Sequence, residues 1–144
     1  MTIDEEQNLI ITEFSRLDDW LKKYEFLSTL GKNHTGINQE MKTDRNALRG
    51  CQSQVWICAQ MISGKVNFRM DSDSLIIRGI LALLLRVIDY RSPSEIVNAN
   101  FYFLREIGLN TTLSPSRANG VATIVKTIKQ LGQKYLEEIS NNKD

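Results

Sequence analysis

An α+β fold is predicted for this chain of 144 residues, with a small antiparallel sheet of about three strands packed against several helices. Two observations predict it. Apolar residues follow a helical spacing toward both ends of the chain, and they alternate with a period of two in one middle segment, residues 55–70. Helices therefore precede and follow the strands, which is typical of the α+β class. The length fits a single domain over residues 1–144.

Two amphipathic helices are predicted before the strands, at residues 4–14 and 17–31. Their apolar stripes are Leu9, Ile10 and Phe14 in the first helix and Trp20, Leu21, Tyr24 and Leu27 in the second. Early acids suit the start of the first helix, and Gly31 is a favourable C-terminal cap for the second. Residues 32–49 are polar and without a sustained period, so they are expected to form a long loop.

A β-hairpin is predicted next. Apolar residues alternate with other residues from Val55 to Met61 and again from Val66 to Met70. A glycine-containing segment, residues 62–65, separates the two runs and is expected to form the turn.

The rest of the chain is predicted to be helical, at residues 71–90, 92–97, 101–109 and 113–140. The first of these helices is apolar on most sides, so it is expected to be buried, with an early aspartate or serine as its cap. The last helix begins with Ser114 and Pro115, residues that suit the N-cap and the first helical position. Its apolar stripe consists of Val121, Ile124, Val125, Ile128 and Leu131.

The composition excludes several classes of function. A net charge of +1 gives no broad electrostatic reason to expect binding to nucleic acid or to a membrane surface. The longest apolar run, residues 80–85, is far too short to span a membrane, and no nucleotide-binding glycine motif is present. The acidic N-terminal residues do not resemble a signal peptide, and the chain has two cysteines, so a cytoplasmic location with reduced thiols is expected.

Cys51 is the strongest candidate for chemistry. It lies in the polar stretch "RGCQSQ" after Gly50, where a thiol at a loop tip can be reached by another protein, although a small buried side chain is the alternative. Reactivity requires the thiolate, which Arg45 and Arg49 would favour if they lie close. Cys58 falls in the strand pattern and is expected to be buried. About seven extended residues, or roughly 23 Å, separate the two cysteines, too far for a disulfide.

Three further residues have both a structural and a functional interpretation. His34, the only histidine, is a candidate base for a cysteine hydrolase, but its Gly- and Asn-containing surroundings favour an exposed turn. One histidine and two cysteines do not complete a closed zinc site without carboxylates, so no metal site is expected. Asp73 is most simply a helix cap. Arg117 is expected in the first turn of the last helix, where a cation opposes the helix dipole; an anion, a partner protein or solvent would explain it.

Four separated stretches occur together in this chain: "GCQSQVWI", "DSD" with "IIRG", "PSEIVN" and "LSPSRANG". In this order they resemble the SufE family, sulfur-acceptor proteins of iron–sulfur cluster assembly. The resemblance extends from about Tyr24 to the end of the last helix. It implies the α+β fold that this family shares with U-type scaffold proteins.

The resemblance also implies a function. Cys51 would accept sulfur from the persulfide of a cysteine desulfurase, stimulate that enzyme, and deliver the sulfur to an iron–sulfur scaffold complex. The chain would then be a covalent carrier without a cofactor of its own, because the PLP would belong to the desulfurase; a monomer or weak homodimer is expected. The cysteine would rest in an apolar hollow beneath its loop. Residues implied to support it or to contact the desulfurase are Gly50, Gln52, Ser53, Asp73 and Arg117.

Three alternative functions remain open. An iron–sulfur scaffold would need about four ligands, mostly cysteine, whereas only one cysteine lies outside the strand pattern. A cysteine hydrolase would need His34 beside Cys51. An interaction module would activate a desulfurase without carrying sulfur, and the mass of the protein after incubation with a desulfurase separates that case from a carrier.

Overall fold

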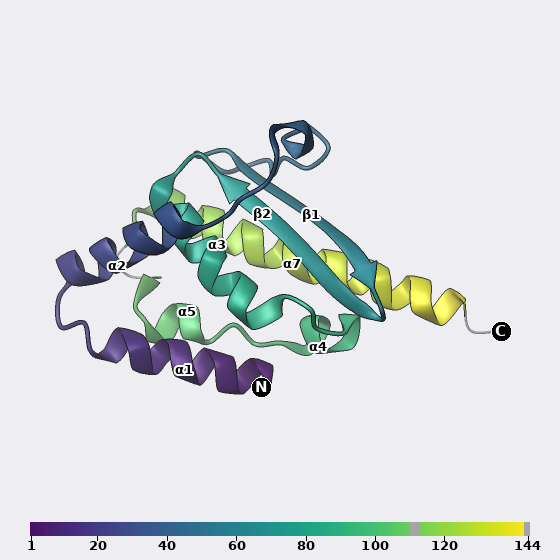
Figure 1. The fold of residues 1–144 in the computed structure, drawn as a ribbon, viewed down its shortest axis with the longest axis horizontal. Coiled ribbons are helices and arrows are strands. Elements are labelled where there is room, and N and C mark those ends of the chain that lie inside the picture. Colours follow the sequence, from purple (N-terminus) through teal and green to yellow (C-terminus); the bar gives the residue numbers. More distant parts are fainter. Residues whose placement is uncertain (110–112, 143–144) are drawn as a thin grey trace.

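The computed structural model describes residues 1–109 and 113–142, and its fold is shown in Figure 1. Its order of elements confirms the predicted α+β class, with helices before and after one hairpin. The elements are α1 (Ile3–Ser15), α2 (Trp20–Asn33), the short 3₁₀ helix η1 (Gln39–Met41), β1 (Val55–Ile62), β2 (Lys65–Ser72), α3 (Leu75–Ile88), α4 (Pro93–Asn98), α5 (Phe103–Glu106) and α7 (Pro115–Asn141). None of the described helices is both long and apolar enough to cross a membrane.

The hairpin forms where the alternation predicts it. β1 and β2 are antiparallel, with Val55 opposite Ser72 and Ile62 opposite Lys65. The turn residues Ser63 and Gly64 have positive φ values of 52° and 80°. Two successive residues in this left-handed region match the right-handed twist of a tight hairpin, which explains the short turn.

The described sheet has two strands, so the prediction of about three was wrong by one. A third segment does reach the free edge of β1, but it pairs only through a single bridge between Ala47 and Trp56. The backbone N–H of Leu48 donates to the carbonyl of Val55 at 2.8 Å. Gly50 then adopts a φ of +84°, which turns the chain away before a longer ladder can form.

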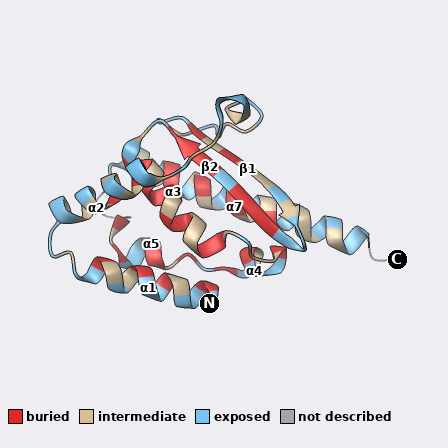
Figure 2. Cartoon of the chain, viewed as in Figure 1, coloured by how far each residue is buried: buried red, intermediate tan, exposed pale blue. Residues whose placement is uncertain are grey.

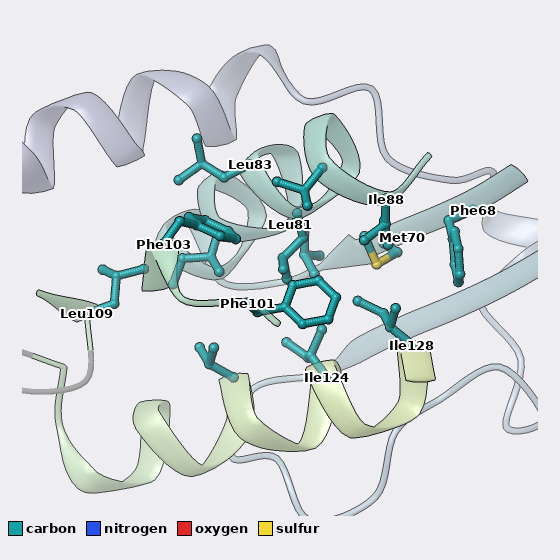
Figure 3. Close-up of a cluster of buried hydrophobic side chains, with 14 of the residues drawn as sticks. Phe68, Met70, Leu81, Leu83, Ile88, Phe101, Phe103, Leu109, Ile124 and Ile128 are labelled. Atoms are coloured by element: carbon teal, nitrogen blue, oxygen red, sulfur yellow. The ribbon is translucent and has the colours of Figure 1, made fainter. Parts of the chain in front are cut away.

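Helix α3 lies in the core, as its apolar sequence predicts. Figure 2 shows buried residues concentrated on α3, on the hairpin and on the inward side of α7. Figure 3 shows Leu81 of α3, Ile124 of α7 and Phe101, which lies between α4 and α5, in one cluster of buried side chains. The hairpin and α7 are therefore held together by apolar contacts around α3, and both carry parts of the site described below.

The predicted stripes of the first two helices are correct only in part. Leu9, Leu21 and Tyr24 were expected to face the core, but they are exposed by 42%, 68% and 41%. Ile10, Phe14 and Leu27 are buried as expected. Both helices lie at the periphery of the fold and are covered on one side only, so part of each apolar stripe remains at the surface.

Two glycines set the crossing of α2 and α3. A Cβ on Gly31 would lie 2.2 Å from the carbonyl oxygen of Leu75, and a Cβ on Gly79 would lie 2.2 Å from that of Leu27. The backbones therefore touch at a place where no side chain fits. The prediction that Gly31 caps α2 was wrong, because the helix continues to Asn33 and the glycine serves the crossing instead.

A buried carboxylate connects the long loop to the core. Asp71, 3% exposed, forms an ion pair with Arg78 and accepts hydrogen bonds from the backbone N–H groups of Ile37 (3.2 Å) and Ser72 (2.8 Å). The Lys42 ammonium lies 3.5 Å away. Burial by itself would raise the pKa of Asp71, but the two N–H groups and the two cations together lower it below its ordinary value.

Candidate functional site

Cys51 lies in a small hollow beneath the segment of residues 50–54, which we call the cysteine loop. Its thiol is half-buried and donates toward the carbonyl oxygen of Gly120, at 3.9 Å from Sγ. The hollow encloses about 10 Å³, close to the smallest space that admits one water molecule. It is lined by Cys51, Gln52, Ser53, Val55, Ile77, Ser116, Arg117, Gly120 and Ile124.

The backbone explains this placement. The hydrogen bond between Leu48 and Val55 closes the base of the loop. Gly50 then takes a left-handed conformation, with open space where a side chain would stand. After this turn Cys51 is half-buried whereas Gln52 is exposed. The thiol is therefore covered by a loop whose base is fixed and whose tip is at the surface.

Burial governs the electrostatics of the thiol. It raises the pKa of Cys51 above the ordinary cysteine value. Arg45 and Arg49, which would favour the thiolate if they lay close to it, are both exposed, and burial is the effect that sets the direction of the shift. At neutral pH the resting residue is thus a thiol, the form that is slow to react and slow to oxidise.

Asp73 anchors the end of the cysteine loop. Its carboxylate accepts a hydrogen bond from the backbone N–H of Gln54 at 2.9 Å, and its own N–H donates to the Gln54 carbonyl at 3.3 Å. The Ser72 hydroxyl donates to the same carbonyl at 2.7 Å. The interpretation of Asp73 as a helix cap was wrong: Ser74 is the N-cap of α3 and accepts from the N–H of Ile77.

Removing this anchor is expected to expose the thiol. Asp73→Ala deletes a hydrogen bond of about 1 kcal/mol, so alkylation of Cys51 should become roughly fivefold faster. Rates of iodoacetamide labelling, followed by mass spectrometry, measure the change. Asp73→Asn keeps an acceptor oxygen and Asp44→Ala removes an exposed acid from the long loop, so both should label at nearly the wild-type rate. Equal rates for Asp73→Ala and wild type would contradict the anchor.

Arg117 occupies the first turn of α7, as the sequence predicts. Ser114 is the N-cap and accepts from the N–H of Arg117 at 3.3 Å. The guanidinium donates to the hydroxyl of Tyr24 on α2 at 2.9 Å and forms no ion pair with any described residue. Because Arg117 also lines the hollow of Cys51, the fold brings a partly exposed cation next to the thiol.

Cys58 is less buried than the strand pattern predicts. It is half-buried on the outer face of β1, because the strand period turns Val55 and Ile57 toward the core. Its thiol donates to the carbonyl of Arg69, 3.7 Å away, and lines a separate cavity of about 360 Å³. Burial raises the pKa of Cys58, and the Arg69 charge partly opposes this. Both cysteines are free, so the prediction of no disulfide with Cys51 is confirmed.

His34 is more buried than the exposed turn that its neighbours predict. Its ring is half-buried rather than exposed, and its Nε2 lies 2.7 Å from the carbonyl oxygen of Met70. The cavity that His34 lines does not include Cys51. A nucleophile–base pair of a cysteine hydrolase is therefore not formed by these two residues. In the described ranges, no three His, Cys, Asp or Glu side chains are grouped so that they could hold a metal ion.

The sequence alone does not indicate which residues form the floor of the hollow. Ile77, Gly120 and Ile124 lie on α3 and α7, far from the cysteine in sequence. One signal was available: Gly120 follows Arg117 by three residues, so both share one face of the predicted helix. Nothing local to Cys51 indicated which helix that face would meet.

Comparison with known proteins gives consistent matches. The family model described as "SufE: Fe-S metabolism associated domain" matches residues 8–132. An uncharacterized SufE-like protein of Synechocystis sp. is 39% identical over 134 residues, covering 89% of this chain and 84% of that protein. One of Rhizobium etli is 36% identical over 126 residues, covering 84% and 85%. The solution structure of a hypothetical protein from Thermus thermophilus shares the fold, with a TM-score of 0.74, 17% identity and coverage of 92% and 96%.

Proposed function

The chain belongs to the SufE family, and we propose on that basis that it carries sulfur on Cys51 for iron–sulfur metabolism. The observation that carries the proposal is the placement of Cys51 on a surface loop, with its thiol turned into a small, partly apolar hollow against α7. A structural cysteine needs no loop of this kind, whereas a carrier must both expose its thiol and protect it.

The proposed reaction is a transfer between sulfur atoms. The Cys51 thiolate attacks the outer sulfur of a persulfide on the cysteine of a desulfurase. A new S–S bond forms at Cys51, and the S–S bond on the desulfurase breaks, releasing its cysteine as a thiolate. The outer sulfur keeps its proton or loses it to solvent, so the products are Cys51–S–SH and a reduced desulfurase. No external oxidant or reductant is needed, as in other thiol–disulfide exchanges.

The geometry supports a two-position cycle for the cysteine loop. In the resting position the half-buried thiol is protonated, because burial raises its pKa. Movement of the loop outward would return the thiol to water, restore its ordinary pKa and increase the thiolate fraction. Docking of the desulfurase would favour that outward position, and the partner would thereby be stimulated because its persulfide is removed. The PLP that generates the persulfide would be held by the desulfurase.

The recipient in this proposal is an iron–sulfur scaffold complex, which would take the outer sulfur from Cys51 by a second exchange of the same type. A direct scaffold role is less well supported. Cys51 faces α7 and Cys58 lies on the outer face of β1 in a different cavity, so the two thiols line no common site in the described part of the chain.

Intact-mass spectrometry tests the proposal. After incubation with a cysteine desulfurase and free cysteine, the protein should gain about 32 Da, the mass of one sulfur atom, and the gain should disappear with a reductant. A protein that accelerates the desulfurase and never gains mass would instead be an activator that does not carry sulfur.

Arg117 is expected to serve the partner contact rather than the fold. Arg117→Ala should change the free energy of unfolding by less than about 0.5 kcal/mol, as an ordinary surface substitution does. It should nevertheless reduce stimulation of the desulfurase. Added salt should reduce the difference in desulfurase rate between the variant and wild type, because charges at the rim of an interface mainly affect the rate of association, which salt screens. Denaturant midpoints and desulfurase rates measure the two effects.

Arg105→Ala provides the matched control, since Arg105 is an exposed arginine on α5. It should keep both stability and stimulation. If Arg117→Ala unfolds early, the residue is structural; if its stimulation equals that of wild type, Arg117 has no part in the contact.

A further inference from the structure

Gly120 faces Cys51 across the hollow. A Cβ built on this glycine would meet a single group within 4 Å, the Sγ of Cys51, at 3.8 Å. That separation is an ordinary van der Waals contact. An alanine would therefore fit beside the resting thiol, and it would also suit a helix interior better than glycine does. The thiol state alone gives no reason for a glycine at this position.

The persulfide state does give a reason. The outer sulfur of a persulfide lies about 2.05 Å from Sγ, so an outer sulfur directed at Gly120 would come far inside the separation of roughly 3.5–4.0 Å that non-bonded atoms need from a Cβ. With glycine that position is free of any side chain. The cavity of about 10 Å³ in contact with both residues has room for about one small atom.

We infer that Gly120 forms a receptor for the outer sulfur of Cys51–S–SH, so that the loaded carrier, like the unloaded one, can rest with its loop closed. The inference rests on the proposed function and adds to it a specific state, the sheltered persulfide. The site takes one neutral or weakly acidic sulfane sulfur. Ile77 and Ile124 provide the apolar part of its wall.

The test compares Gly120→Ala with the parent protein, both carrying Cys58→Ser so that one thiol remains. Cys51 is first converted to a mixed disulfide with thiopyridine. Hydrosulfide then displaces the thiopyridine as its thiolate and leaves Cys51–S–SH. Cyanide removes the outer sulfur as thiocyanate and regenerates the Cys51 thiolate, so the rate of thiocyanate formation reports exposure of that sulfur. No desulfurase takes part, so the outcome is independent of whether Cys51 is loaded by one.

Gly120→Ala should release thiocyanate about tenfold faster than the parent, because the added methyl group excludes the outer sulfur from the packed hollow. Its unloaded thiol should be alkylated at the parent rate, and its melting temperature should not fall. Asn119→Ala, an exposed neighbour on α7, makes a comparable gain in helix propensity and should leave both rates unchanged.

Two results would overturn the inference. Equal thiocyanate rates in Gly120→Ala and parent would mean that the outer sulfur does not occupy this space. A parallel increase in alkylation of the unloaded thiol would mean that the methyl group opens the loop in every state, and that the glycine serves the thiol rather than the persulfide.

Discussion

Cys51→Ser is expected to abolish sulfur uptake, and Cys58→Ser is expected to leave it intact. A serine hydroxyl does not displace a thiolate from a persulfide, so no S–S bond can form at residue 51. Cys58 lies on the outer face of β1 in a separate cavity and has no covering loop. After incubation with a desulfurase and cysteine, wild type and Cys58→Ser should each gain about 32 Da, and Cys51→Ser should gain nothing.

The denaturant midpoint of each variant shows whether a variant that gains no sulfur is nevertheless folded. Cys51→Ala, which places no hydroxyl in the hollow, should behave as Cys51→Ser does. A folded Cys51→Ser protein that still acquires one sulfur, removable by a reductant, would assign the carrier role to Cys58 and refute the proposed site.

Asp71→Ala is expected to cause the largest loss of stability, about 3–5 kcal/mol in the free energy of unfolding. The substitution leaves the partly buried Arg78 without its carboxylate and frees the backbone N–H groups of Ile37 and Ser72. It also releases Lys42, and with it the attachment of the long loop to β2. Chemical denaturation followed by circular dichroism measures the loss.

Asp18→Ala is the matched control, because Asp18 pairs with Lys22 at 2.7 Å on the surface of the protein. Its loss should cost at most about 0.5 kcal/mol, as for other exposed pairs one helical turn apart. Equal effects of the two substitutions would show that the buried cluster around Asp71 contributes no more than a surface ion pair.

The stability difference between wild type and Asp71→Ala should depend on pH. The folded pKa of Asp71 is lowered, so its contribution is fully present above the ordinary aspartate value of about 3.9. It should be lost as the pH falls from there through the folded pKa, where the carboxylate becomes protonated in the native state as well. The difference should therefore be constant between about pH 5 and 8 and shrink in more acidic solution.

Local patterns predicted the elements well because local physics determines them. Ser114 and Pro115 begin α7 where capping preferences place them, and the period of two gives both strands of the hairpin. The position of Cys51 on a loop also follows from its polar neighbours. These features depend on residues within a few positions of one another, so the sequence reveals them directly.

The errors concern contacts between distant segments. Gly31 was interpreted as a cap because the α3 backbone that it touches is more than forty residues away. Asp73 was interpreted as a cap because its hydrogen-bond partner, Gln54, is 19 residues away, in the loop before β1. Gly120 gave no local sign that a thiol lies opposite it. Periodicity defines a face of an element, but only the packed chain shows what that face meets.

The closed base of the cysteine loop limits how far the thiol can travel. The chain is pinned where Leu48 bonds to Val55, and Cys51 is three residues from one end of this tether and four from the other. At about 3.6 Å per residue, the Cα atom of Cys51 can lie at most roughly 11 Å from that of Leu48. If Cys51 carries sulfur as proposed, it meets the donor persulfide within this reach of the loop base, so the length of the cysteine loop limits how far apart the two docked cysteines can lie.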